Sequence, residues 1–221
     1  DNTAPADQTD AYRGLNALLD AARGAIVILC HQDITFLDDD RSILDLRLAE
    51  LDTHDPTWAV AGNAGGIGPG SLALRITDPH GIDQKVGTFP ARVATLDENF
   101  LIIRRASRVG FSHDLDGFHF YGADICLHAA LMGCSSYVID FHLHHRSAGK
   151  KDKTFAAAEA AFRRKWSNAL RSRWLQTTCT LVHLAGNPAR QAFGRLIDSP
   201  LSRLIRRLPH ARGFKHHKLR A

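Results

Sequence analysis

The chain has 221 residues, of which 44% are hydrophobic and 23% charged. This composition indicates a globular protein and excludes an intrinsically disordered chain, and the length suits one α/β domain with its own core. The net charge is +5, with acidic residues gathered before residue 58 and most Lys and Arg after Arg146. The basic end indicates either an anionic partner or a solvated basic face, and composition alone does not choose between them.

The four cysteines, Cys30, Cys126, Cys134 and Cys179, form no CxxC pair. The sequence therefore predicts no disulfide framework and favours a reducing compartment. Cys30 and Cys126 lie in apolar runs and are predicted to be buried. No signal peptide is apparent, and the longest apolar run is too short to span a bilayer. These features together predict a cytoplasmic location.

The first half of the chain alternates predicted helices and strands. Thr9 or Asp10 can cap a first helix, which is predicted to end at Gly24. A continuous apolar run from Ala25 to Cys30 follows, and such a run is typical of a strand buried on both faces of a parallel sheet. The further elements predicted here are a helix from the Asp38–Asp40 cluster through Leu51, a strand over Trp58–Ala61, a glycine-rich loop over Gly62–Gly70 and a strand over Leu72–Ile76.

The second half continues the same alternation. Its predicted elements are a strand over Phe100–Arg104, a helix over Ala123–Met132, a strand over Ser136–Leu143 and a long amphipathic helix from Phe155 to Trp174. This order predicts an α/β fold with a mostly parallel central sheet flanked by helices. Because the first strong element is a helix, we expect that one or more strands precede Asp1 in the complete fold.

Candidate metal ligands lie at two predicted strand ends. His31, Gln32 and Asp33 directly follow the first strand, and ligand sites of open α/β sheets lie beyond the carboxyl ends of strands. A carboxylate there can bind Mg²⁺ or Mn²⁺, although a plain polar loop explains the same three residues. His142, His144 and His145 end the last core strand, where they are either metal ligands or structural histidines.

Other polar groups suggest acid–base and binding roles. Asp124 begins a predicted helix, where it is either a general base facing a cleft or a helix-capping residue. Asp97, Glu98 and the pair Arg104–Arg105 flank a predicted strand, where they either bind an acceptor or an anionic substrate or are edge charges. The glycines of 62–66 do not form a P-loop, because no Gly-Lys-Ser/Thr follows them. They do not form a dinucleotide fingerprint either, because their spacing is wrong and no helix is predicted to begin there.

Several segments in a fixed order resemble a known family. They are Ala22–Gly24, His31–Asp33, Trp58–Gly62, Leu96–Phe100, Phe118–Leu127 and His142–Gly149. In this series the chain resembles bacterial family 2-like glycosyltransferases, which have a GT-A fold. The resemblance covers residues 1–175 and leaves 176–221 as a basic C-terminal extension. It implies an N-terminally incomplete GT-A domain.

The resemblance also implies a reaction and its residues. A metal-dependent transferase of this type moves a sugar from a nucleotide-diphospho-sugar to an acceptor hydroxyl with inversion, and such enzymes serve bacterial cell-surface polysaccharide biosynthesis. Asp124 would be the catalytic base. The implied ligands of a divalent Mn or Mg ion are Asp33, His31, His144 and His145. The implied donor-binding residues are Asp1, Asn2 and Gln32, and the implied acceptor-binding residues are Asp97, Glu98, His119 and Arg104.

The implied partners are a nucleotide-sugar donor and a saccharide or lipid-linked acceptor. The basic tail over Ser202–Arg220 adds the option of peripheral contact with the inner face of the membrane. No nucleic-acid partner is expected, because no recognised binding module is present. Two departures, His31 and Gly122 in place of family acids, support the alternative of an inactive GT-A-like protein that binds a sugar nucleotide or a metal.

Overall fold

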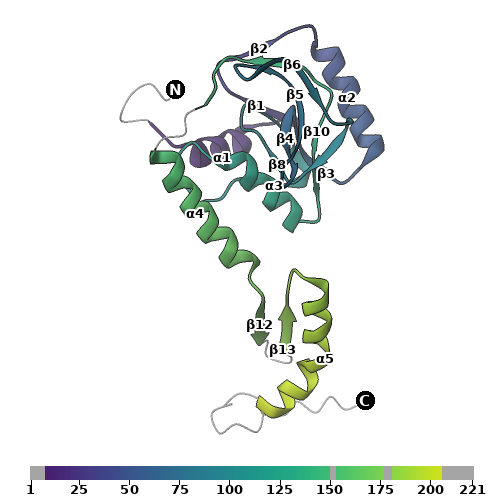
Figure 1. The fold of residues 1–221 in the computed structure, drawn as a ribbon, viewed down its shortest axis with the longest axis vertical. Helices are drawn as coiled ribbons and strands as arrows, with labels where there is room; N and C mark the ends of the chain where they lie inside the picture. The colour runs from purple at the N-terminus through teal and green to yellow at the C-terminus, as the bar shows by residue number, and fades with distance from the viewer. Residues whose placement is uncertain (1–7, 150–152, 177–180, 206–221) are drawn as a thin grey trace. The chain divides into compact units, whose positions relative to one another are not determined.

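The computed structural model describes residues 8–149, 153–176 and 181–205. The chain forms two compact units, which divide between Phe162 and Arg163 (Figure 1). The boundary predicted from the sequence lies at residue 175. The predicted donor residues Asp1 and Asn2 lie outside the described residues.

A five-stranded sheet forms the centre of the first unit. In spatial order its strands are β1 (Ile26–Cys30), β9 (Phe100–Arg104), β3 (Trp58–Gly62), β10 (Ser135–Val138) and β7 (Ala91–Val93). Only the pairing of β3 with β10 is parallel within this sheet. The α/β class is therefore confirmed, whereas the prediction of a mostly parallel sheet is wrong.

The strand β1 lies at the edge of this sheet and pairs with β9 alone, antiparallel. Val27 and Leu29 face the core, while Ile28 is 41% exposed. The prediction of a strand buried on both faces is wrong, because on the second face only Ile26 packs against the core. Cys30 is consequently exposed, and Cys126 is buried as predicted.

A second sheet packs beside the first. Its strands run in the order β2 (Ile34–Phe36), β11 (Leu143–His145), β5 (Ser71–Asp78), β4 (Ala64–Gly68) and β8 (Thr95–Leu96), and β6 (Gly81–Val86) also pairs with β5. The predicted glycine-rich loop is thus partly a strand. At Gly65 a Cβ would lie 2.4 Å from the carbonyl oxygen of Thr95, so the close pairing of β4 with β8 depends on glycine.

The predicted strand over residues 136–143 is in fact two strands in two sheets. β10 pairs with β3 in the first sheet, and β11 pairs with β2 and β5 in the second. The chain changes sheet between Val138 and Leu143. The sequence does not reveal this change, because buried apolar residues continue through Ile139 and Phe141 from one strand to the next.

The first two helices begin at the predicted caps. The side chain of Asp10 accepts a hydrogen bond from the backbone of Arg13 at the start of α1 (Ala11–Ala21). Asp40 does the same for the backbone N–H groups of Ser42 and Ile43 at the start of α2 (Arg41–His54). The remaining helices are α3 (Tyr121–Leu131), α4 (Lys153–Leu170) and α5 (Pro188–Ile205).

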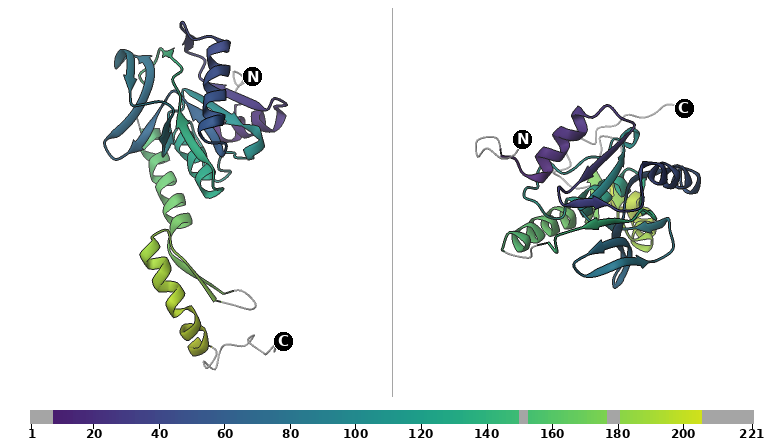
Figure 2. Two further views of the ribbon diagram at one scale, coloured as in Figure 1. Left: turned by 90° about the vertical axis from the view of Figure 1, so that its right-hand side faces the viewer. Right: turned by 90° about the horizontal axis from the view of Figure 1, so that it is seen from above.

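The first unit has three layers. Leu101 and Ile103 of β9 face a cluster that includes Tyr12 of α1 and Ile125 of α3. The alternating residues of β9 face a second cluster that includes Leu48 of α2. Helices α1 and α2 therefore cover different faces of the central sheet (Figure 2). Burial on both faces of β9 explains why its whole sequence is apolar up to Arg104.

The second unit contains the antiparallel pair β12 (Arg173–Gln176) and β13 (Leu181–Leu184), followed by α5. Trp174 had been predicted on the long helix, but it lies on β12 with its ring 4.7 Å from that of His183. Within the described ranges, no helix is long and apolar enough to cross a bilayer. The predicted basic tail falls largely on residues outside those ranges.

Candidate metal centre and ligand pocket

Strand pairing brings the two predicted groups of metal ligands together. His31 is the first residue after β1, and its backbone N–H donates to the carbonyl of Asn99 at 2.9 Å. Asp33 directly precedes β2, and β2 pairs with β11 so that His145 lies opposite Ile34. His145 therefore reaches the turn between β1 and β2, although more than a hundred residues separate the two in sequence.

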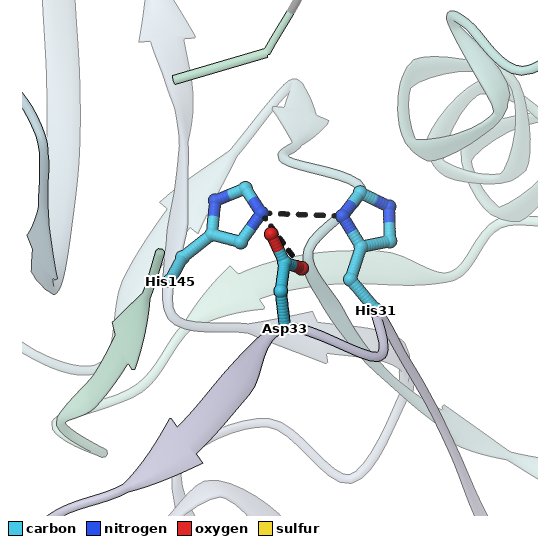
Figure 3. A group of neighbouring side chains, drawn as sticks. All are labelled: His31, Asp33 and His145. Atoms are coloured by element: carbon cyan, nitrogen blue, oxygen red, sulfur yellow. Dashed lines mark hydrogen bonds and ion pairs between the residues drawn. The ribbon is translucent and has the colours of Figure 1, made fainter. Parts of the chain in front are cut away.

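His31, Asp33 and His145 point their polar atoms toward one another (Figure 3). The Nδ1 atom of His31 lies 3.3 Å from Nε2 of His145, which in turn lies 3.4 Å from Oδ1 of Asp33. Two ligands of a tetrahedral ion with bonds of about 2.0–2.1 Å lie about 3.3 Å apart. Two separations in this group therefore match the spacing that a small transition-metal ion requires.

A neighbouring hydroxyl holds the imidazole of His31 in place. The hydroxyl of Tyr121 lies 2.8 Å from Nε2 of His31, the ring nitrogen on the far side from the group, whereas Oγ of Ser147 lies 3.2 Å from Nε2 of His145, the nitrogen that itself faces the group. When Nε2 of His31 carries the proton and donates to Tyr121, the lone pair of Nδ1 points into the group. Outer hydrogen bonds of this kind orient metal-ligating histidines in proteins.

The carboxylate of Asp33 carries the clearest mark of a ligand. Its Oδ1 atom is buried and has no hydrogen-bond partner among the described residues. Burial alone would raise the pKa of Asp33, but a hydrogen bond from Ser147 and the neighbouring His145 lower it below the ordinary value. Asp33 is therefore ionised at neutral pH, with one oxygen that no protein donor satisfies.

The protonation state of His31 also suits a ligand. Burial lowers the pKa of His31 below that of an ordinary histidine, and the nearby His145 lowers it further. The ring is therefore neutral at neutral pH. A neutral imidazole and an ionised carboxylate are the forms that bind metal ions.

A pocket of about 770 Å³ opens beside this group. Its polar end contains Gln32 and Ser147 with His31 and Asp33 of the group, and its apolar wall includes Leu15 and Leu18 of α1 together with Phe118. Pockets that combine apolar walls with a few converging polar groups are typical sites for small molecules. The geometry therefore joins a candidate metal centre to a space that a small ligand can enter.

Glu98 lines the same pocket and is half-buried. Burial and the adjacent Asp97 raise the pKa of Glu98 to about 7, although the backbone N–H groups at the start of α3 oppose this shift. The carboxyl group of Glu98 can thus accept or release a proton near neutral pH. Perturbed groups in pockets of this kind are candidates for function.

The other predicted ligands and binding residues lie elsewhere. His144 is next to His145 on β11, but successive strand residues point to opposite faces, and it is absent from the group. The exposed Asp97 accepts hydrogen bonds from Asn99. His119 packs its ring 5.3 Å from that of Phe155 on α4. Arg104 lies at the opposite end of β1 from the group, because β9 runs antiparallel to β1.

The prediction that Asp124 faces a cleft is wrong. Its side chain is 0% exposed, and its two carboxylate oxygens accept hydrogen bonds from the backbone N–H and the hydroxyl of Ser112, at 2.8 and 2.6 Å. The hydroxyl of Ser112 also lies 3.0 Å from Nε2 of His128. Asp124 therefore ties α3 to the preceding loop, and an acceptor hydroxyl has no route to it.

Sequence reasoning gave no role to Tyr121 or Ser147. Tyr121 lies in the segment Phe118–Leu127, and Ser147 lies two residues after His145. Nothing in the spacing of Tyr121 connects it to His31. Their contact depends on α3 beginning beside the end of β1, which only the folded chain reveals.

Comparison with known proteins gave one named relative and no matching family model. The protein named ATP synthase subunits region ORF 6 from Fuscovulum blasticum is 37% identical over 175 residues. The matching segment covers 76% of this chain and 70% of that protein.

This relative overturns the functional part of the resemblance. Its name refers to ATP synthase subunits and contains no reference to sugar transfer. The predictions of a glycosyltransferase, of hexosyl transfer by an enzyme and of a role in cell-surface polysaccharide biosynthesis are therefore wrong. The predicted partners, a nucleotide-sugar donor, a saccharide or lipid-linked acceptor and a membrane surface bound by the tail, are wrong on the same ground.

Proposed function

We propose that this chain, which belongs to the family of the Fuscovulum blasticum protein ATP synthase subunits region ORF 6, is a metal-binding protein with a ligand pocket at its metal centre. His31, Asp33 and His145 are the proposed ligands. The observation that carries the proposal is the buried Oδ1 atom of Asp33, which faces two imidazole nitrogens and has no hydrogen-bond donor among the described residues.

The chemistry of the three side chains favours a first-row transition metal. Imidazole suits Zn²⁺ and Fe²⁺, and the carboxylate also suits Mn²⁺, whereas Mg²⁺ prefers an octahedral shell of oxygen ligands and keeps several waters. Of the two ions predicted from sequence, Mn²⁺ therefore fits better than Mg²⁺. Three protein ligands leave at least one coordination position for a water or for an oxygen of a bound molecule.

A small molecule in the pocket could occupy this open coordination position. A metal ion held by the group would lie at the polar end of a pocket whose other wall is apolar. Such an ion supplies a positive charge that binds an oxygen atom of a small molecule. The walls from α1 and Phe118 would cover an apolar part of the same molecule, and Glu98 would exchange a proton with it.

Isothermal titration of Zn²⁺ and Mn²⁺ into the metal-free chain tests the proposal. We expect one ion per chain and a loss of binding in His145→Ala. The matched control is His142→Ala, because His142 lies three residues away but bonds to Thr77, with 2.9 Å between Nε2 and Oγ1. Equal binding by wild type and His145→Ala would reject the site, and so would an equal loss in the control.

The GT-A arrangement of the first unit remains a prediction. The three α/β/α layers and the sequence His31-Gln32-Asp33 after β1 support a GT-A-like arrangement. An experimental structure of the chain, superposed on known GT-A domains, tests this arrangement. A strand order that cannot be aligned with those domains would exclude it.

A second candidate function, favoured by the name of the relative, is association with ATP synthase subunits. Helix α5 offers a surface for it, because Phe193, Leu196 and Leu204 are 63%, 77% and 59% exposed and share one helix face. Co-purification of the chain with ATP synthase would test this function. Loss of co-purification in Leu196→Asp, but not in Arg190→Gln on the same helix, is the expected result.

A further inference from the structure

A second pocket of about 950 Å³ lies in the first unit, at the opposite end of β1 from the metal group. Its lining includes Ala25 and Ile26, where β1 begins, whereas the metal group follows Cys30, where β1 ends. Five strand residues at about 3.3 Å each separate the two places by about 17 Å. The two pockets are therefore distinct sites.

Arginine dominates the lining of this second pocket. The charged residues that line it are Arg23, Arg104, Arg105, Arg108 and Asp52. Four guanidinium groups and one carboxylate leave three positive charges around one cavity. The remaining lining residues are small or apolar, namely Ala25, Ile26, Pro56 and Ala106.

The single carboxylate of this pocket, that of Asp52, already accepts two hydrogen bonds. Asp52 accepts a hydrogen bond from Arg104 and another, at 2.7 Å, from the indole N–H of Trp58. Arg104 also donates to the carbonyl of Pro56 and lies over the ring of Trp58, 4.4 Å from its centroid. Arg104 and Asp52 therefore pair with each other, and Asp52 does not neutralise the other three arginines.

Arg23, Arg105 and Arg108 are exposed, and no carboxylate of the described residues lies within salt-bridge distance of them. Arg105 donates to the backbone carbonyl of Arg23 at 3.3 Å, which brings these two residues together. Like charges gathered in this way repel one another unless an anion lies between them. The cavity thus holds three cations that a ligand can neutralise.

The backbone of Arg108 supplies an independent observation. Arg108 ends the short helix η1 (Arg105–Ser107) with a φ of 55°, in the left-handed region that favours glycine. Its N–H donates to the carbonyl of Arg105. A non-glycine residue in this conformation is uncommon, and such positions gather at functional sites. Glycine would make the same turn with less strain, so Arg108 is a position where a substitution can remove the side chain without harm to the backbone.

We propose that this arginine pocket binds a small ligand that carries two or three linked phosphate groups. The planar guanidinium fork matches the oxygens of a phosphate and donates two parallel hydrogen bonds to it. Three unpaired arginines around one cavity match a compact polyphosphate in charge, and the apolar lining residues can contact the rest of the molecule. The site is independent of the metal centre.

Titration of pyrophosphate and tripolyphosphate into the full chain, with EDTA present, tests this proposal. We expect tripolyphosphate to bind more tightly than pyrophosphate, and single phosphate to bind weakest. Arg105→Gln and Arg108→Gly should each weaken tripolyphosphate binding about tenfold, because each removes one charge-assisted contact. Arg108→Gly also suits the local backbone, so it should fold at least as stably as the wild type.

Two controls make the test specific. Arg92→Gln removes an exposed arginine on β7, outside the pocket, and should change the affinity less than about twofold. Asp33→Ala should leave tripolyphosphate binding unchanged, because Asp33 belongs to the other pocket. Equal weakening by Arg92→Gln, loss of binding in Asp33→Ala, or no binding by the wild type would each overturn the proposal. A glutamate-rich peptide that binds more tightly than tripolyphosphate would overturn it in favour of a protein partner.

Discussion

Two of the places in the first unit where aspartate and histidine meet differ in whether all their polar atoms have hydrogen-bond partners. In one cluster, Asp124 has both oxygens bonded to Ser112 and is fully buried. In the other, Asp33 keeps one oxygen without a donor among the described residues, and the cluster opens onto a pocket. Residue types alone do not separate a structural cluster from a binding site. A binding site is distinguished by polar atoms that lack a hydrogen-bond partner and by a pocket that a ligand can enter.

The largest expected effect is the loss of metal binding in Asp33→Ala. Removal of one of three ligands should weaken the affinity for Zn²⁺ by about a thousandfold, or about 4 kcal/mol, because changes even outside the ligands cost up to a hundredfold. The free energy of unfolding of the metal-free protein should fall by only about 1 kcal/mol, because the variant loses the hydrogen bond from Ser147 and the contact with His145, while the buried Oδ1 has no hydrogen bond to lose. Titration calorimetry and urea unfolding in EDTA measure the two quantities. Strong destabilisation without metal would make Asp33 a structural residue.

Asp124→Ala should show the reverse pattern. It leaves the buried N–H of Ser112 without its acceptor and leaves the Ser112 hydroxyl with His128 alone, so we expect the free energy of unfolding to fall by about 3 kcal/mol. The affinity for Zn²⁺ should stay within about twofold of the wild type in the folded protein, since Asp124 is no ligand. Urea unfolding compared with Asp116→Ala, at an exposed aspartate, measures the effect. Equal stability of the two variants would contradict the structural role of Asp124.

Glu98 should make stability depend on pH. Its pKa is raised in the folded protein to about 7, so the folded state binds the proton more tightly than the unfolded state does. The free energy of unfolding should therefore fall as the pH rises from about 4.5 through 7, by about 2 kcal/mol. Glu98→Gln carries no titrating group and should remove this part of the slope. Urea unfolding at several pH values measures it, and parallel curves for both proteins would exclude Glu98 as its source.

The smallest effect is expected at Tyr121. Tyr121→Phe removes the hydroxyl that bonds to Nε2 of His31 but leaves all three proposed ligands in place. We expect about tenfold weaker Zn²⁺ binding, or about 1.4 kcal/mol, because the imidazole loses the partner that orients it. Tyr12→Phe is a matched control, since the hydroxyl of Tyr12 bonds to the carbonyl of His119 instead. A similar loss of affinity in both variants would exclude a specific role for Tyr121.

Local sequence determined much of the secondary structure. The caps Asp10 and Asp40, and the apolar spacing of the helices that follow them, indicated α1 and α2 correctly. The same was true of the strand over Phe100–Arg104. These elements depend on hydrogen bonds and side-chain periodicity within a few residues, which a single sequence contains. The sequence also marked His31, Asp33 and His145 as candidate ligands.

The tertiary structure alone decided how these parts combine. An apolar run reads the same whether its strand lies at the edge or in the centre of a sheet, so the edge position and antiparallel direction of β1 were not predictable. The pairing of β2 with β11 places His145 in the candidate metal centre, and His144 is not part of that centre. Packing of α3 buried Asp124 and closed the predicted cleft. Each outcome depends on contacts between residues far apart in sequence, and the spacing of residues along a chain does not encode those contacts.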